Sequence, residues 1–152
     1  MIKKNKVVLN KDYLYMAIDF GDKKIGFAIG QLITNNSAPI KIVRNHKNKI
    51  NWPEIQNTIS NWKPNVIIIG YPYTLNKNSF IKRLDKFIED LTKKYQDTIQ
   101  IFTFSEVLST EESKALYADI RKSNYNISKK GDIDDLSASI ILQSWFNENM
   151  IR

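Results

Sequence analysis

The fold is decided by the stretch Met16-Ala17-Ile18-Asp19-Phe20-Gly21-Asp22-Lys23-Lys24-Ile25-Gly26-Phe27-Ala28-Ile29-Gly30. It predicts two strands joined by a tight turn, because apolar residues fill both arms and Gly21 and Gly26 bracket the polar residues between them. Asp19 ends an otherwise apolar strand, where a carboxylate is costly unless it is paired, hydrogen-bonded or bound to a metal. Asp19 is therefore the first candidate for a chemical centre. The alternative is an aspartate that only starts the turn.

Composition favours one soluble domain with an anionic partner. The chain has 152 residues, of which 42% are hydrophobic and 26% charged, as expected for a single globular domain over 1–152 with a basic segment at 1–11. A net charge of +7 favours nucleic acid or a membrane surface. No apolar run approaches the roughly 20 residues that span a bilayer, and the N-terminus lacks a signal-peptide core, so we expect a cytoplasmic protein.

Absent residue types exclude several chemistries. The chain has no cysteine, which excludes disulfides, thiolate metal sites and cysteine nucleophiles. The single histidine, His46, lies in a polar stretch and cannot build a histidine-rich zinc site. We expect His46 to be a surface residue.

The rest of the chain alternates helices and strands. The apolar periodicities predict a third strand, then a helix opened by Asn51, a buried strand, a helix from Ser79, a fifth strand and two closing helices. The order βββ-α-β-α-β-α-α predicts a mixed five-stranded sheet with helices on both faces, which is the element order of the ribonuclease H-like fold. The expected ranges are 37–43, 52–62, 66–70, 79–95, 98–104, 109–121 and 133–146.

Acidic residues recur at the ends of these elements. Besides Asp19, Glu106 follows the fifth strand, and Asp132, Asp134 and Asp135 open the last helix. Converging carboxylates repel one another unless a cation lies between them, and Mg²⁺ or Mn²⁺ suits oxygen ligands. Such ions can activate water and stabilise the leaving oxygen of a phosphodiester. The alternatives are a helix cap at Asp132 and a solvated loop acid at Glu106.

Four motifs in order resemble the YqgF/RuvX family, described both as Holliday junction resolvases and as pre-16S ribosomal RNA nucleases. The resemblance covers about residues 14–146 and implies a ribonuclease H-like fold. Its motifs are Ile18–Ala28, Ile68-Ile69-Gly70-Tyr71-Pro72, Ser105-Glu106-Val107-Leu108-Ser109-Thr110 and Lys130-Gly131-Asp132-Ile133-Asp134-Asp135-Leu136-Ser137-Ala138.

The resemblance implies a site for Mg²⁺ or Mn²⁺ made of Asp19, Glu106 and Asp134, with Asp135 as the runner-up to Asp134. Lys23 and Lys24 match a basic pair in the first turn. Lys129 and Lys130 form a second basic pair, and both pairs are candidates for contacts to phosphates. The sequence departs from the family at Ser105 and Val107, where an aspartate and an arginine are usual.

The expected function is a metal-dependent nuclease that processes the 5′ end of pre-16S rRNA or resolves Holliday junctions, with nucleic acid as partner, as a monomer or homodimer. Because of Ser105 and Val107, the alternative is a catalytically weakened nucleic-acid- or ribosome-binding factor of the same fold. A phosphotransferase or ATPase of the actin type shares an Ile-Asp-x-Gly loop. Such proteins need two related domains, and this chain is long enough for one.

Overall fold

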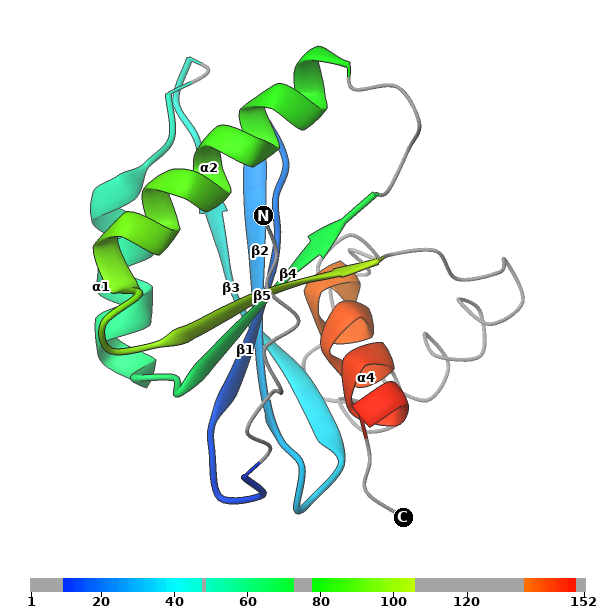
Figure 1. Cartoon of the computed structure of the whole chain (residues 1–152). Coiled ribbons are helices and arrows are strands. Elements are labelled where there is room, and N and C mark those ends of the chain that lie inside the picture. The colour runs from blue at the N-terminus through cyan, green and yellow to red at the C-terminus, as the bar shows by residue number, and fades with distance from the viewer. Residues whose placement is uncertain (1–9, 48, 73–77, 106–135, 150–152) are drawn as a thin grey trace, which may run out of the picture.

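A mixed five-stranded sheet forms the centre of the molecule (Figure 1). The computed structural model describes residues 10–47, 49–72, 78–105 and 136–149. The sheet has the order β3-β2-β1-β4-β5, and its five strands confirm the predicted mixed five-stranded sheet. Its strands are β1 (Tyr15–Asp19), β2 (Lys24–Gln31), β3 (Asn36–Arg44), β4 (Val66–Tyr71) and β5 (Gln100–Ser105).

The strand directions bring three strand ends to one edge. β1, β2 and β3 form an antiparallel meander, whereas β1, β4 and β5 run parallel. β4 lies between β1 and β5, and Val66–Gly70 is buried throughout, as its unbroken β-branched run predicts. The carboxyl ends of β1, β4 and β5 therefore lie side by side, with Asp19 as the last residue of β1.

Helices cover both faces of the sheet. α1 (Trp52–Trp62) and α2 (Ser79–Tyr95) lie on one face and α4 (Ser137–Asn149) on the other (Figure 1). Because side chains alternate along a strand, Met16 and Ile18 pack toward α1 and α2, while Tyr15 and Ala17 pack toward α4. None of these helices is long and apolar enough to cross a membrane, within the residues that the structure describes.

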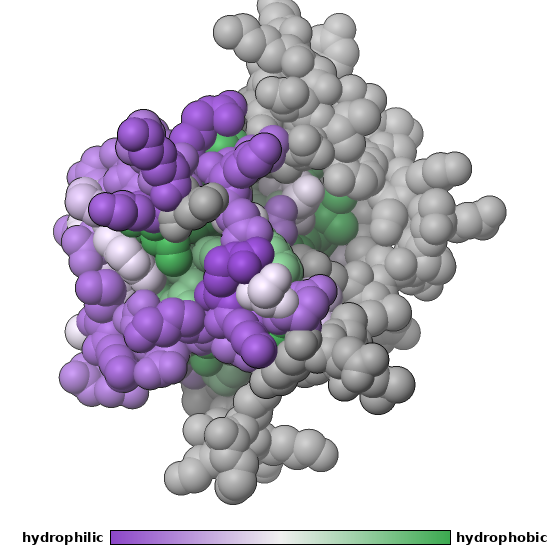
Figure 2. Space-filling model, turned by 90° about the horizontal axis from the view of Figure 1, so that it is seen from above, coloured by the Kyte–Doolittle hydropathy of each residue, from purple (hydrophilic) through white to green (hydrophobic). Residues whose placement is uncertain are grey.

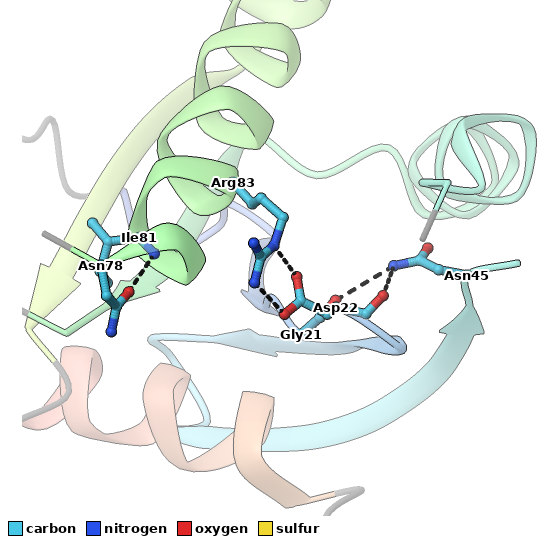
Figure 3. Close-up of polar contacts among 6 residues, drawn as sticks. All are labelled: Gly21, Asp22, Asn45, Asn78, Ile81 and Arg83. Atoms are coloured by element: carbon cyan, nitrogen blue, oxygen red, sulfur yellow. Dashed lines mark hydrogen bonds and ion pairs between the residues drawn. The ribbon is translucent and has the colours of Figure 1, made fainter. Parts of the chain in front are cut away.

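Two asparagines start the helices on the first face. The Asn51 side chain accepts a hydrogen bond from the Glu54 amide (3.3 Å), and Asn78 accepts one from the Ile81 amide (2.9 Å; Figure 3). These caps satisfy amides that have no partner within the helix. The predicted cap at Asn51 is confirmed.

Two local expectations are wrong. The helical spacing of Trp52, Ile55, Ile59 and Trp62 predicts one apolar face that includes Trp62. Trp62 is instead 42% exposed, because it is the last residue of α1 and the buried surface is formed by earlier residues. Gly26 does not bracket the turn: it lies inside β2 and pairs with Asp19. The turn is thus shorter than predicted. The predicted helix at 109–121, most of the basic segment at 1–11 and the first residues of the predicted last helix lie outside the described residues.

Candidate functional site

Asp19 lies at the sheet edge where the parallel strands end, on the face that α4 covers. Tyr15 and Ala17 of the same strand pack in the α4 cluster, so the alternation of the strand places Asp19 on that face as well. Its side chain is half-buried. This is the edge at which sheets of this kind gather functional groups.

Gly26 separates Asp19 from the start of α4. A Cβ atom on Gly26 would lie 3.9 Å from the Asp19 Cβ and 3.8 Å from the Ala138 Cβ. Asp19 and the first turn of α4 are therefore neighbours across a residue that has no side chain. A larger residue at position 26 would fill the space beside the carboxylate.

The turn after Asp19 is held by close backbone packing. A Cβ on Gly21 would lie 2.6 Å from the backbone oxygen of Lys24, so only glycine fits there. The Asn45 side-chain amide donates to the backbone oxygens of Asp22 (3.0 Å) and Gly21 (3.4 Å), as Figure 3 shows. The backbone amide of Asn45 donates to the Lys23 oxygen at 2.9 Å. One residue of the β3–α1 connection thus fixes the turn.

An ion pair joins the same turn to α2. Arg83 donates to Asp22 through Nε to Oδ1 (2.6 Å) and through Nη2 to Oδ2 (2.8 Å), in the bidentate geometry drawn in Figure 3. The hydrogen bonds from Arg83 lower the pKa of Asp22 below its usual value, and Asp22 in turn raises the pKa of Arg83. The two residues are 61 positions apart in sequence, so no local pattern predicts this pair.

The two lysines of the turn lie in different surroundings. Lys23 is exposed within the turn, whereas Lys24 is the first residue of β2 and is partly buried. Ile25 and Phe27 pack toward α1 and α2, so alternation places Lys24 on the α4 face with Asp19. Lys24, one of the predicted basic residues, therefore lies on the same face of the sheet as the Asp19 carboxylate.

The other predicted site residues are Glu106, Asp134, Asp135, Lys129 and Lys130, and all five lie outside the described residues. Their neighbours in the chain are placed: Ser105 ends β5 beside Tyr71 of β4, and Ala138 lies near Asp19. Within the described ranges, no three acidic or histidine side chains gather into a group that could hold a metal. Because only Asp19 of the three predicted ligands is described, the metal site stays a prediction.

The exposed position of His46 confirms the expectation that it is a surface residue. The sequence interpretation missed Asn45 and Arg83, which fix the turn beside Asp19. Asn45 precedes His46 in a polar stretch that carries no catalytic motif. Neither residue shows a local sequence signal for its role.

Comparison with known proteins gives the chain relatives over nearly its whole length. A family model described as "RuvX: Holliday junction resolvase" matches residues 13–148. A protein of Blochmanniella floridana named "Putative pre-16S rRNA nuclease" is 36% identical over 144 residues, which cover 93% of this chain and 99% of the relative. A protein of the same name from Vibrio vulnificus is 36% identical and covers 86% of this chain and 93% of its own.

Solved structures share the fold at low sequence identity. The fowlpox virus resolvase in complex with Holliday junction DNA has a TM-score of 0.64 at 16% identity, covering 91% of this chain and 99% of its own. RuvC of Thermus thermophilus with its Holliday junction substrate has a TM-score of 0.61 at 9% identity, covering 91% and 96%. The predicted ribonuclease H-like fold is confirmed. The chain belongs to the RuvX Holliday junction resolvase family, a family of nucleases that hydrolyse phosphodiester bonds.

Proposed function

We propose that this protein is a cytoplasmic, metal-dependent nuclease that processes the 5′ end of pre-16S rRNA, with its active site at the edge where Asp19 ends β1. The carrying observation is the position of Asp19, half-buried at the carboxyl edge of the parallel strands and next to the first turn of α4. The rRNA substrate follows the name of the Blochmanniella and Vibrio relatives.

The donor set fits a hard cation. Asp19 supplies carboxylate oxygens, and the chain has no cysteine and a single histidine, which lies elsewhere. Oxygen donors are the ligands that Mg²⁺ and Mn²⁺ prefer. We infer that Asp19, Glu106 and Asp134 hold the ion, with Asp135 as the alternative to Asp134. When bound, the ion lowers the pKa of water and stabilises the charge on the leaving oxygen.

Strand geometry supports the inclusion of Glu106. Glu106 directly follows Ser105, which ends β5 at the same edge as Asp19. β4 is the only strand between β1 and β5, so β1 and β5 are about 10 Å apart at a strand spacing of about 4.8 Å. Aspartate and glutamate side chains that extend from such backbones reach a common ion.

Chain connectivity supports the inclusion of Asp134 or Asp135. They precede Ala138 by four and three residues, and Ala138 lies beside Gly26, the pairing partner of Asp19. The short connection restricts how far either carboxylate can lie from Asp19.

The protein's own residues orient the substrate. β1 is paired on both sides, so the backbone that carries Asp19 is fixed before substrate binds. Lys24, on the same face, attracts the phosphate, and Lys23, Lys129 and Lys130 extend the positive potential along the strand that is cut. A monomer suffices for trimming one RNA end, whereas a four-way junction needs two sites and thus a homodimer.

A cleavage assay tests this function. The full chain is incubated with a pre-16S rRNA fragment and with a four-way DNA junction, each with Mg²⁺, with Mn²⁺ or with EDTA. We expect metal-dependent cutting of the RNA, and a loss of at least about 100-fold in Asp19→Asn. The matched control is Asp97→Asn, an exposed aspartate before β5 at the opposite edge of the sheet.

The outcomes are distinct. Equal cleavage by wild type and Asp19→Asn would exclude the proposed site. Cutting of the junction alone would replace the RNA substrate with branched DNA. A third outcome is tight RNA binding without cleavage of either substrate. It is favoured by Ser105, because this serine stands where the family usually has an aspartate. That result would establish the catalytically weakened binding factor instead.

A further inference from the structure

A second basic feature lies beside the candidate site, on the opposite face of the sheet. A pocket of about 520 Å³ opens between the β1–β2 turn, the β3–α1 connection and α2. Its lining includes Phe20, the residue that follows Asp19, so the pocket begins one residue away from the candidate carboxylate. Figure 2 shows this side of the molecule, where hydrophilic side chains surround a hollow in which hydrophobic residues are visible.

The rim of the pocket is positively charged. Lys82, Arg83 and Lys86 line it from α2. Asp22 pairs with Arg83, and Asp90 lies 3.1 Å from the Lys86 ammonium, so the three cations exceed the two carboxylates by one charge. Lys82 and Lys86 are exposed and one helical turn apart, so both extend from the same side of α2. Two like charges at this spacing repel each other slightly, and a bound anion relieves that repulsion. The rim is thus complementary to phosphate.

The floor of the pocket is apolar and fixed. Phe20 is 7% exposed and packs against Phe87 with ring centroids 4.8 Å apart. Ile50 adds a half-buried aliphatic side chain from the β3–α1 connection. A cationic rim above an apolar floor matches the two parts of a nucleotide, its phosphate and its base.

The walls keep their shape without a ligand. Asn45 binds the turn through its side-chain amide, and its Oδ1 accepts from the Asn51 amide at 3.1 Å. The Asp22–Arg83 pair closes the third side by joining the turn to α2. Only two of the five N–H donors of Arg83 are used in this pair. A preformed pocket of this kind loses little entropy when it binds.

We propose that this pocket binds an unpaired nucleotide in the single-stranded segment of the nucleic acid that flanks the cut, with phosphates on Lys82 and Lys86 and a base on the floor formed by Phe20 and Ile50. The inference rests on the proposed function, because it takes the ligand to be the same strand that reaches Asp19. An unpaired base can enter a hollow between three chain segments, whereas a base pair within a duplex cannot.

The test measures binding without cleavage. Fluorescence anisotropy is recorded in EDTA with a labelled single-stranded RNA, a blunt RNA duplex and the same duplex carrying a single-stranded tail. The variant is Lys82→Gln/Lys86→Gln and the control is Lys93→Gln/Lys94→Gln on the same helix. Both remove two charges and one ion pair, which is Lys86–Asp90 (3.1 Å) in the variant and Lys93–Glu89 (3.0 Å) in the control. The control also removes the cation–π contact of Lys94 with the Trp52 ring (5.1 Å to the centroid), so the proteins are compared at matched folded fractions.

We expect the variant to bind single-stranded and tailed RNA about 10-fold more weakly, and the control to stay within about twofold of wild type. The slope of log K against log salt should fall by about 1.4 in the variant, as for two phosphate contacts on a single strand. The blunt duplex should bind the variant as tightly as it binds wild type. A strand with abasic residues should bind wild type more weakly than the intact strand.

Three results would overturn the proposal: equal losses in variant and control, equal losses on blunt and tailed duplexes, or equal binding of abasic and intact strands. These results do not depend on catalysis. A protein that cuts no substrate but shows the expected binding differences would refute the proposed function and leave the pocket assignment intact. Metal-dependent cutting with no binding difference would support the proposed function and refute the pocket assignment.

Discussion

The two faces of the sheet are built from different kinds of residue. The face under α1 and α2 is packed with large apolar side chains such as Ile18, Ile67 and Phe87. The face under α4 combines large strand residues such as Tyr15 and Ile68 with small ones at Ala17, Ala28 and Gly26, and its helix contributes large aromatic rings.

Polar groups are also divided unequally between the faces. The α4 face carries Asp19 at its edge, the buried hydroxyl of Ser37 on β3 and the buried hydroxyl of Ser139 on the helix. Small strand residues leave room for the helix and for a carboxylate, whereas large ones fill the space completely. The first face therefore supplies the larger hydrophobic cluster, and the second has the small residues beside the candidate carboxylate.

The largest expected effect tests the packing of the first face. Phe87 has no exposed surface, stacks on Trp52 at 5.3 Å and contacts Phe20 at 4.8 Å. Phe87→Ala should lower the free energy of unfolding by about 3–5 kcal/mol, because it removes a buried ring and leaves a cavity. Urea denaturation measures the loss. A change below about 1 kcal/mol would mean that this face is not the main core.

The second prediction concerns the α4 face. Gly26→Leu places a side chain between Asp19 and Ala138 and should slow cleavage about 100-fold, because small displacements of a catalytic group have effects of this size. Gly26→Ala is the control, since its Cβ would make ordinary contacts at 3.5 Å or more and should cost only a few-fold. Cleavage rates are compared at matched folded fractions, determined by circular dichroism. Full activity in Gly26→Leu would show that Asp19 is not part of the active site.

The same contrast explains what the sequence could predict. β4 and α2 follow from unbroken or periodic apolar runs, and the mixed five-stranded sheet follows from the sequence of elements. Asn51 was predicted as a cap because its position relative to Pro53 is a local signal. These features all depend on neighbours in the chain, and most of them build the first face.

The candidate site was predicted less completely because it depends on contacts between distant segments. The sequence predicts that Gly26 borders the turn, but its pairing with Asp19 and its approach to α4 have no local signature. The Asp22–Arg83 pair and the pocket beside it join segments that are far apart in sequence. Asp19 is a candidate site residue in the sequence because a carboxylate that ends an apolar strand violates the pattern around it, and the structure places it at the end of β1. Functional residues are expected at such violations.

A third prediction compares two serines on the α4 face. Ser37 donates to the backbone oxygen of Ser139 at 2.8 Å in a buried setting, so Ser37→Ala should cost about 1 kcal/mol. The Ser139 hydroxyl is buried and has no hydrogen-bond partner among the described residues, so Ser139→Ala should be neutral or stabilise by up to about 1 kcal/mol. Thermal denaturation of the two variants should give shifts of opposite sign or a clear difference in size. Equal destabilisation would show that the Ser139 hydroxyl is satisfied.

The smallest expected effect is the pH dependence of the ion pair that joins the β1–β2 turn to α2. Arg83 lowers the pKa of Asp22 in the folded protein, so the pair stabilises the fold above the usual carboxyl pKa of about 3.9, and its contribution is lost as the pH falls through the lowered value. Asp22→Asn should therefore melt about 2 °C below wild type at pH 7, and the difference should shrink as the pH falls below the usual carboxyl pKa and the Asp22 carboxylate becomes protonated. Asp97→Asn removes an exposed aspartate that has no ion pair among the described residues, and should show no comparable trend.

Asp22→Asn also frees Arg83 at the rim of the pocket, so it should bind single-stranded RNA more tightly than wild type at neutral pH. A variant that is less stable but binds more tightly would separate the structural role of the pair from the role of the pocket, and weaker binding would show that the pair holds Arg83 in the geometry that the RNA requires.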